Sequence, residues 1–146
     1  MRAFPILRVV TKILIPYIIL FAFYVQFHGD FGPGGGFQAG VIFAAGIILY
    51  ALVFGLSAAR RVVTPVAVEV MTALGVLVYA VTGVVTMLLG GNFLDYDALE
   101  HQFLPNFLPS GQHLGIFLVE TGVGITVAAV MIAIFYSFAG RERAPS

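Results

Sequence analysis

The chain has 146 residues, of which 60% are hydrophobic and 10% are charged, and its formal net charge is zero. A soluble core cannot account for so much apolar sequence, so we expect a single membrane domain over residues 1–146. The neutral charge argues against nucleic acid as a partner, and the lack of cysteine in the sequence excludes disulfides, thiol catalysis and cysteine metal sites.

Four apolar runs follow in chain order, and each reaches the ~20 residues that a helix needs to cross a bilayer core. We expect transmembrane helices over about residues 9–27, 37–56, 66–89 and 114–138. Pro65 stands just before the third run, where proline suits a first helical turn. The pattern therefore predicts an all-α integral membrane protein with four transmembrane helices.

The cationic side chains are confined to one predicted side of the membrane. They are Arg2, Arg8, Lys12, Arg60, Arg61, Arg141 and Arg143. The loops on the other side carry Asp30, Asp95, Asp97 and Glu100. Because cytoplasmic loops retain Lys and Arg, we expect both the N- and the C-terminus in the cytoplasm. So complete a bias also argues against a small dual-topology exporter working as a homodimer, because such an exporter needs a nearly equal distribution of Lys and Arg between the two sides.

Small residues predict how the helices pack, because helices in lipid associate through close backbone approach. Each of three runs places small residues on one face. These are Gly40, Ala44, Ala51 and Gly55 in the second run, Ala73 and Ala80 in the third, and Gly115, Gly122, Thr126, Ala129 and Ala133 in the fourth. We expect these faces to be the helix contacts.

Two carboxylates lie inside apolar runs, where a charge costs about 2.5–3.5 kcal/mol at the helix centre. Glu69 lies one turn inside the third run, on the face of Ala73 and Ala80, and Lys12 is expected at a similar depth. We favour a structural role for Glu69, either in an ion pair with Lys12 or as a charge that reaches the lipid headgroups. The alternative places both residues on an ion path.

Glu120 lies on the face of the fourth run opposite its small residues, together with His113 and Gly124. A helix with one face for close packing and a carboxylate on the other is expected to be covered by protein on both sides. We therefore expect the chain to need a partner. Glu120 and His113 are candidates for a proton or cation path, and a carboxyl bonded to a neighbouring helix is an equally favoured alternative.

The segment before the second run is rich in glycine. Its distinctive residues are Pro33, Gly34, Gly35, Gly36, Phe37, Gln38 and Gly40. It lacks the Gly-Lys-Ser/Thr of a phosphate-binding loop, and although a helix N-terminus can hold an anion, we expect a tight turn with Gly36 and Gly40 starting a packing face. His28 and Asp30 are a weaker candidate for a cation contact at the outer surface. Without a catalytic or metal-ligand spacing, the sequence predicts neither an enzyme nor a cofactor or metal site.

The residues from Phe27 to Ile42, with Pro-Gly-Gly-Gly-Phe-Gln at their core, closely resemble the MnhB (also called MrpB) family of small subunits, which belong to the Mrp-type multisubunit cation/proton antiporters. A second resemblance covers residues 111–115 and 120–127, and together with the four runs it extends over nearly the whole chain. The resemblance extends to the residues of the motif, and it assigns no catalytic role to any residue.

The resemblance implies a multi-pass subunit of a prokaryotic plasma-membrane complex that exchanges Na⁺ for H⁺. Its partners would be the other antiporter subunits and the lipid bilayer, with Na⁺ and H⁺ handled by the whole complex. The small subunits are expected to serve assembly and to line an ion path. The alternative is a membrane-arm subunit of a redox-driven complex such as a membrane-bound hydrogenase, which related subunits also form.

Overall fold

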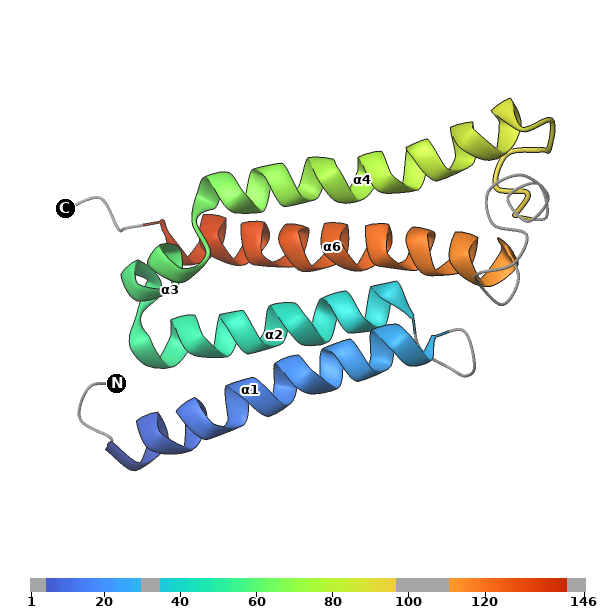
Figure 1. Cartoon of the computed structure of the whole chain (residues 1–146). Helices are drawn as coiled ribbons and strands as arrows, with labels where there is room; N and C mark the ends of the chain where they lie inside the picture. The colour runs from blue at the N-terminus through green and yellow to red at the C-terminus, as the bar shows by residue number, and fades with distance from the viewer. Residues whose placement is uncertain (1–4, 30–34, 97–110, 142–146) are drawn as a thin grey trace.

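The computed structural model describes residues 5–29, 35–96 and 111–141. Their helices are α1 (Pro5–His28), α2 (Gly36–Phe54), α3 (Leu56–Val62), α4 (Pro65–Leu88) and α6 (Gly111–Ala139). The structure confirms the predicted all-α fold, since α1, α2, α4 and α6 are each long and apolar enough to cross a membrane. The start of α1, the short α3 and the end of α6 lie at one end of the molecule (Figure 1).

The four long helices form an open row in the order α1, α2, α6, α4 (Figure 1). The extensive contacts are those of α1 with α2, α2 with α6, and α6 with α4, whereas α1 touches α6 only slightly. The helices α2 and α6 are therefore flanked on two sides, and α1 and α4 are the edges. In the most apolar window of α1 only 11% of the residues are buried, against 39% in α2, so the edges present large apolar faces to their surroundings.

Close backbone contacts hold this row together, and the predicted faces of α2 and α6 are confirmed except at Gly55, which follows the end of α2 and makes no close contact. Gly40, Ala44 and Ala51 are buried on α2. A Cβ added at Gly40 would lie 2.6 Å from the carbonyl oxygen of Gly124 on α6. Gly122 of α6 meets α4 in the same way, since an added Cβ would lie 2.8 Å from the carbonyl oxygen of Gly75. Glycine permits this approach because it has no side chain.

For contacts within this chain, the predicted face of α4 is wrong. Ala73 and Ala80 are exposed, while Gly75, Thr82 and Gly83 are buried. The positions of Ala73 and Gly75 differ by two residues, which is about 200° around a helix. The glycine determines the face because it allows α4 to approach the backbone of α6 more closely than an alanine would.

The segment between the second and third spans forms the short helix α3, which the sequence did not predict. The helix α2 ends at Phe54, because Gly55 has a φ of 101° that a helix cannot continue. The connection is fixed by Arg60, which donates a 3.2 Å hydrogen bond to the carbonyl oxygen of Tyr136 and lies 5.6 Å from the centre of its ring. The hydroxyl of Tyr136 donates in turn to the carbonyl oxygen of Val63 at 3.0 Å.

Replacing Arg60 by alanine should lower the thermal stability of the protein, because α3 would lose its bond to the C-terminal turn of α6. A hydrogen bond to a charged group contributes about 1.5–3 kcal/mol, although partial exposure reduces that value here. Arg61→Ala is the matched control, since Arg61 is exposed and makes none of the contacts described for Arg60. Equal thermal unfolding of the two variants in detergent would show that Arg60 does not anchor α3.

The segment after α4 folds back onto α4 and α6. Thr86 is fully buried, and its hydroxyl oxygen accepts a 3.0 Å hydrogen bond from the backbone N–H of Leu94 and donates to the carbonyl oxygen of Gly83 at 2.8 Å. The ring of Tyr96 lies against Gly115. Burial, and then the neighbouring Tyr79, raise the pKa of the Tyr96 phenol above its usual value.

Candidate functional site

Glu120 of α6 reaches the junction between α1 and α2, where glycines make room for its carboxylate. A Cβ added at Gly29 would lie 2.5 Å from Oε2 of Glu120, and one added at Gly35 would lie 2.7 Å from Oε1. We call Gly29, Gly35 and Gly36 the glycine cradle. Any larger side chain at Gly29 or Gly35 would occupy the space of the carboxylate, so the cradle and Glu120 fit each other.

The glycines of the cradle meet two different physical requirements. Gly35 has a φ of 112°, a left-handed backbone conformation that favours glycine. Gly36 lies so close to α6 that an added Cβ would collide with the backbone carbonyl of Glu120. Gly40, one turn further on, repeats this close approach at Gly124. The prediction that Gly36 and Gly40 start a packing face is therefore confirmed.

The cradle also places the carboxylate beside the N-terminus of α2. Gly35 is the N-cap residue and provides no side-chain hydrogen bond, and the first turn of α2 contains no acidic residue. The first N–H groups of a helix lack partners within the helix, and its N-terminus carries the positive end of the helix dipole. The sequence analysis favoured a tight turn over an anion at this N-terminus, and the structure brings a carboxylate of the same chain close to it.

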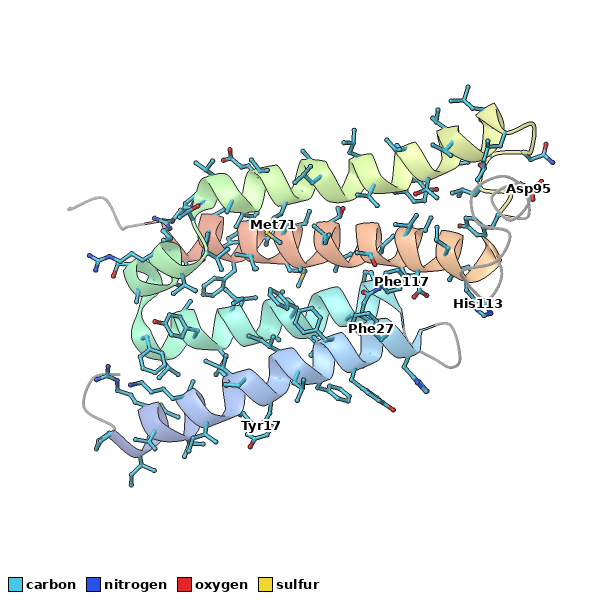
Figure 2. The ribbon with its side chains drawn as sticks, viewed as in Figure 1. Tyr17, Phe27, Met71, Asp95, His113 and Phe117 are labelled. Carbon is cyan, nitrogen blue, oxygen red and sulfur yellow. The ribbon has the colours of Figure 1, made fainter. Side chains whose placement is uncertain are left out.

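His113 and His28 lie at the same end of the molecule as the cradle. His113 is exposed in the first turn of α6 (Figure 2). It precedes Glu120 by seven residues, which is about 10 Å along the helix axis. The ring of His28 stacks on Tyr24 with 5.4 Å between the ring centres. Asp30, with Pro33 and Gly34 of the motif, lies outside the described residues, whereas Phe37 and Gln38 are exposed at the start of α2.

The structure does not bring Lys12 and Glu69 together. Lys12 is on α1, with its ammonium nitrogen 5.8 Å from the centre of the Phe54 ring. Glu69 is exposed on α4, and α4 lies at the opposite edge of the row from α1 (Figure 1). The expected pair is thus absent from the described part of the chain, and the two residues do not form one path with Glu120 within it.

The prediction that protein covers two faces of the fourth helix is confirmed, but other helices of this chain provide both coverings, and a partner is not needed for either. The face with Gly122 packs on α4, and the face with Glu120 packs on the glycine cradle. The order of helices in the row places α6 between its own neighbours. The faces left open belong to the edge helices α1 and α4.

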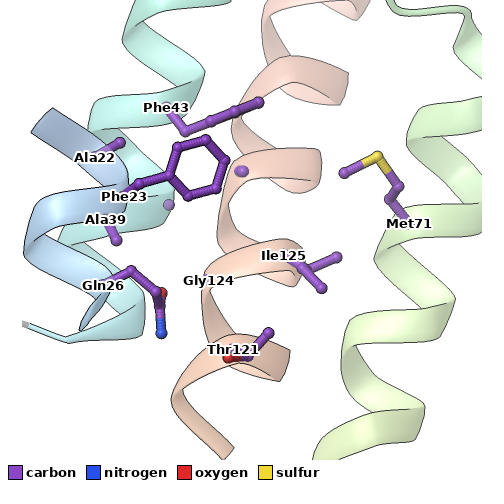
Figure 3. Close-up of a pocket in the computed structure, with 11 residues that line it drawn as sticks. Ala22, Phe23, Gln26, Ala39, Phe43, Met71, Thr121, Gly124 and Ile125 are labelled. Carbon is purple, nitrogen blue, oxygen red and sulfur yellow. The ribbon is translucent and has the colours of Figure 1, made fainter. Parts of the chain in front are cut away.

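A cavity beside the cradle contains polar residues that were not singled out from the sequence. Its volume is about 220 Å³, and residues of α1, α2, α4 and α6 line it (Figure 3). Gln26 and Thr121 are among them, and most of the remaining lining is apolar. The available signals were an amide, Gln26, within the first apolar run, and the place of Thr121 in the second segment of the family resemblance.

Comparisons with known proteins identify the family of this chain. A family model described as a domain related to the MnhB subunit of the Na⁺/H⁺ antiporter matches residues 6–133. Proteins described as antiporter subunit mnhB2 from Staphylococcus aureus strains Newman and JH1 are each 31% identical over 135 residues, covering 92% of this chain and 94% of the relative. The match extends over the cradle and Glu120 alike, and the chain therefore belongs to the MnhB-related family of Na⁺/H⁺ antiporter subunits.

Proposed function

We propose that the chain is a multi-pass plasma-membrane subunit of a multisubunit Na⁺/H⁺ antiporter. The match of the family model over residues 6–133 carries this proposal, and the four membrane-spanning helices agree with it. The family description and the relatives both name an antiporter, which favours this function over the membrane arm of a redox-driven complex. The chain is a transporter subunit, and secondary antiport belongs to the complex as a whole.

The proposal is tested by purifying the tagged chain from native membranes and identifying the proteins that accompany it. We expect other antiporter subunits in fixed ratio, and loss of Na⁺-dependent H⁺ exchange by membrane vesicles when the chain is deleted. Co-purified hydrogenase or iron–sulfur subunits would support the redox complex instead. A stable oligomer of this chain alone would contradict both.

Within the complex we propose that Glu120 serves proton or cation transfer while its cradle joins α1 and α2 to α6. A carboxylate in a spanning helix is costly unless it faces protein or water, and such residues commonly mark ion pathways. The contact with the glycines supports the structural half of this role. The ionisable oxygens beside the N-terminus of α2 support the transport half.

We also propose that the end of the molecule with the glycine cradle lies on the outer side of the membrane and that both termini are cytoplasmic. The described cations Arg8, Lys12, Arg60, Arg61 and Arg141 belong to the start of α1, to α3 and to the end of α6, which lie at the opposite end. This distribution is the one that cytoplasmic retention of positive charge produces.

We propose that the exposed face of α4 contacts a neighbouring subunit at Glu69. An exposed carboxylate in a spanning helix needs a polar partner, and the exposed Ala73 and Ala80 on the same face permit close approach. Glu69→Gln should therefore lower the recovery of neighbouring subunits with the tagged chain, whereas Glu69→Asp, which keeps the charge, should lower it less. Normal recovery with Glu69→Gln would mean that the carboxylate reaches the headgroups instead.

A further inference from the structure

Two cationic side chains of α1 converge on a single aromatic ring at the end of α2. The guanidinium carbon of Arg8 lies 5.3 Å from the centre of the Phe54 ring, and the ammonium nitrogen of Lys12 lies 5.8 Å from the same point. A cation within about 6 Å of a ring centre is attracted to the electrons of the ring. The ring of Tyr50, one turn earlier on α2, stacks on Phe54 with 4.8 Å between the ring centres and supports its position.

The packing of α1 on α2 brings these two charges together. Thr11 and Ala22 are buried on α1, and Arg8 lies one turn before Thr11, so it continues the buried face to the start of the helix. Lys12 lies one turn after Arg8, which is about 6 Å further into the membrane. Its ammonium group nevertheless reaches the ring of Phe54, the last residue of α2, as a long side chain does when its charge returns to the membrane surface.

Within the part of the chain that the structure describes, no carboxylate lies beside these two charges. The acidic residues described are Glu69, Asp95 and Glu120. Glu69 belongs to α4, at the other edge of the row from α1 (Figure 1). Asp95 lies at the opposite end of the molecule (Figure 2), as does the glycine cradle that holds Glu120. Two like charges one turn apart on a helix repel each other, and an aromatic ring has no net charge to offset them. The pair is therefore open to an anion from its surroundings.

We infer that Arg8 and Lys12, placed by the ring of Phe54, bind the phosphate group of an anionic phospholipid. A guanidinium matches the oxygens of a phosphate, an ammonium adds a compact charge, and basic side chains near the membrane surface attract anionic lipids. A lipid is favoured over a free phosphate ion because the surface beside the cations is apolar. Val9 and Ile13, which follow the two cations in the sequence, are 57% and 60% exposed. One phospholipid supplies an anion at the level of the headgroups and acyl chains along the exposed face of α1.

The test labels the assembled complex with photoreactive lipids. The tagged complex is placed in phosphatidylcholine nanodiscs with increasing amounts of a diazirine-labelled phosphatidylglycerol, or of a phosphatidylcholine with the same label. Mass spectrometry then identifies the cross-linked peptides. We expect phosphatidylglycerol to label the start of α1 and the end of α2 in excess over phosphatidylcholine. Replacing both Arg8 and Lys12 by glutamine should lower the apparent affinity for phosphatidylglycerol about 25-fold, since each basic side chain near the membrane surface contributes about fivefold.

Two further proteins separate this site from the general surface charge. Arg61→Gln combined with Arg141→Gln is the matched control, because both arginines are exposed and neither is among the cations described at the Phe54 ring. This control removes the same charge and should retain most of the affinity. Phe54→Leu keeps every cationic side chain, so it remains informative if the double glutamine variant inserts poorly. It should lower the affinity about two- to fivefold for each cation that the ring no longer holds.

Equal labelling of this region by the two lipids would overturn the inference and would indicate a carboxylate of a neighbouring subunit beside the two cations. A loss of affinity in the control as large as in the double glutamine variant would also overturn it, because the preference would then belong to the surface charge as a whole. An unchanged affinity in Phe54→Leu would show that the ring does not place the cations. Displacement of the labelled lipid by inorganic phosphate at constant ionic strength would indicate a site for a free anion instead.

Discussion

Replacing Gly36 by alanine is expected to prevent α2 from packing on α6 and to remove the subunit from the assembled complex. The added Cβ would collide with the backbone carbonyl of Glu120, and a backbone cannot turn aside as a flexible side chain can. Relief requires the two helices to separate, which also loosens the contact of Gly40 with Gly124. Overpacking costs about 1–3 kcal/mol where side chains can adjust, and we expect the upper part of that range or more. The amount of the chain that co-purifies with the other subunits measures the effect.

The matched control is Gly46→Ala, which adds the same methyl group to a buried glycine of the same helix. At Gly46 the nearest atom to an added Cβ is Cγ2 of Ile18 at 3.4 Å, an ordinary van der Waals contact. Alanine also favours a helix over glycine by about 0.8–1.0 kcal/mol. Gly46→Ala should therefore assemble at least as well as the wild type. Equal yields of the two variants would show that the approach of Gly36 to Glu120 is not needed for packing.

The spans could be predicted from the sequence because bilayer thickness fixes the length of an apolar helix, whatever it packs against. The contact faces could be predicted only where the small residues included glycine, as in α2 and α6. In α4 the two alanines misled the prediction, since the face depends on where the partner helix offers its own glycine. The helix α3 contains seven residues with two arginines, and it is too short and too charged to resemble a span.

The candidate site could be predicted in its parts but not in its arrangement. The glycine-rich motif and the segment after Glu120 each carry the family resemblance, yet they lie more than eighty residues apart in the sequence. In the structure they form the two halves of one contact, with the carboxylate of Glu120 seated between Gly29 and Gly35. Chain order does not reveal that α6 lies between α2 and α4. The argument that a partner must cover the second face failed for that reason, although the family of the chain bears out the partners themselves.

Glu120→Gln is expected to remove Na⁺-dependent H⁺ exchange while the complex still assembles. Glutamine has nearly the shape of glutamate, so it fits the cradle at Gly29 and Gly35. The variant loses a negative charge beside the N-terminus of α2, an interaction that contributes about 0.3–1 kcal/mol at exposed sites and up to about 2 kcal/mol at partly buried ones. That loss is too small to prevent assembly, but an amide takes up neither a proton nor a cation as a carboxylate does.

Two measurements on the Glu120 variants separate transport from structure: the yield of assembled complex, and exchange by vesicles that contain equal amounts of it. Glu120→Asp keeps the charge on a side chain one methylene shorter, which draws the carboxylate back from the cradle. If transfer depends on the ionisable group, Glu120→Asp should retain part of the exchange that Glu120→Gln loses. If the carboxylate only stabilises the junction of α1 and α2, both variants should assemble less well and should exchange normally once assembled. Full exchange with normal assembly in Glu120→Gln would exclude a transport role for Glu120.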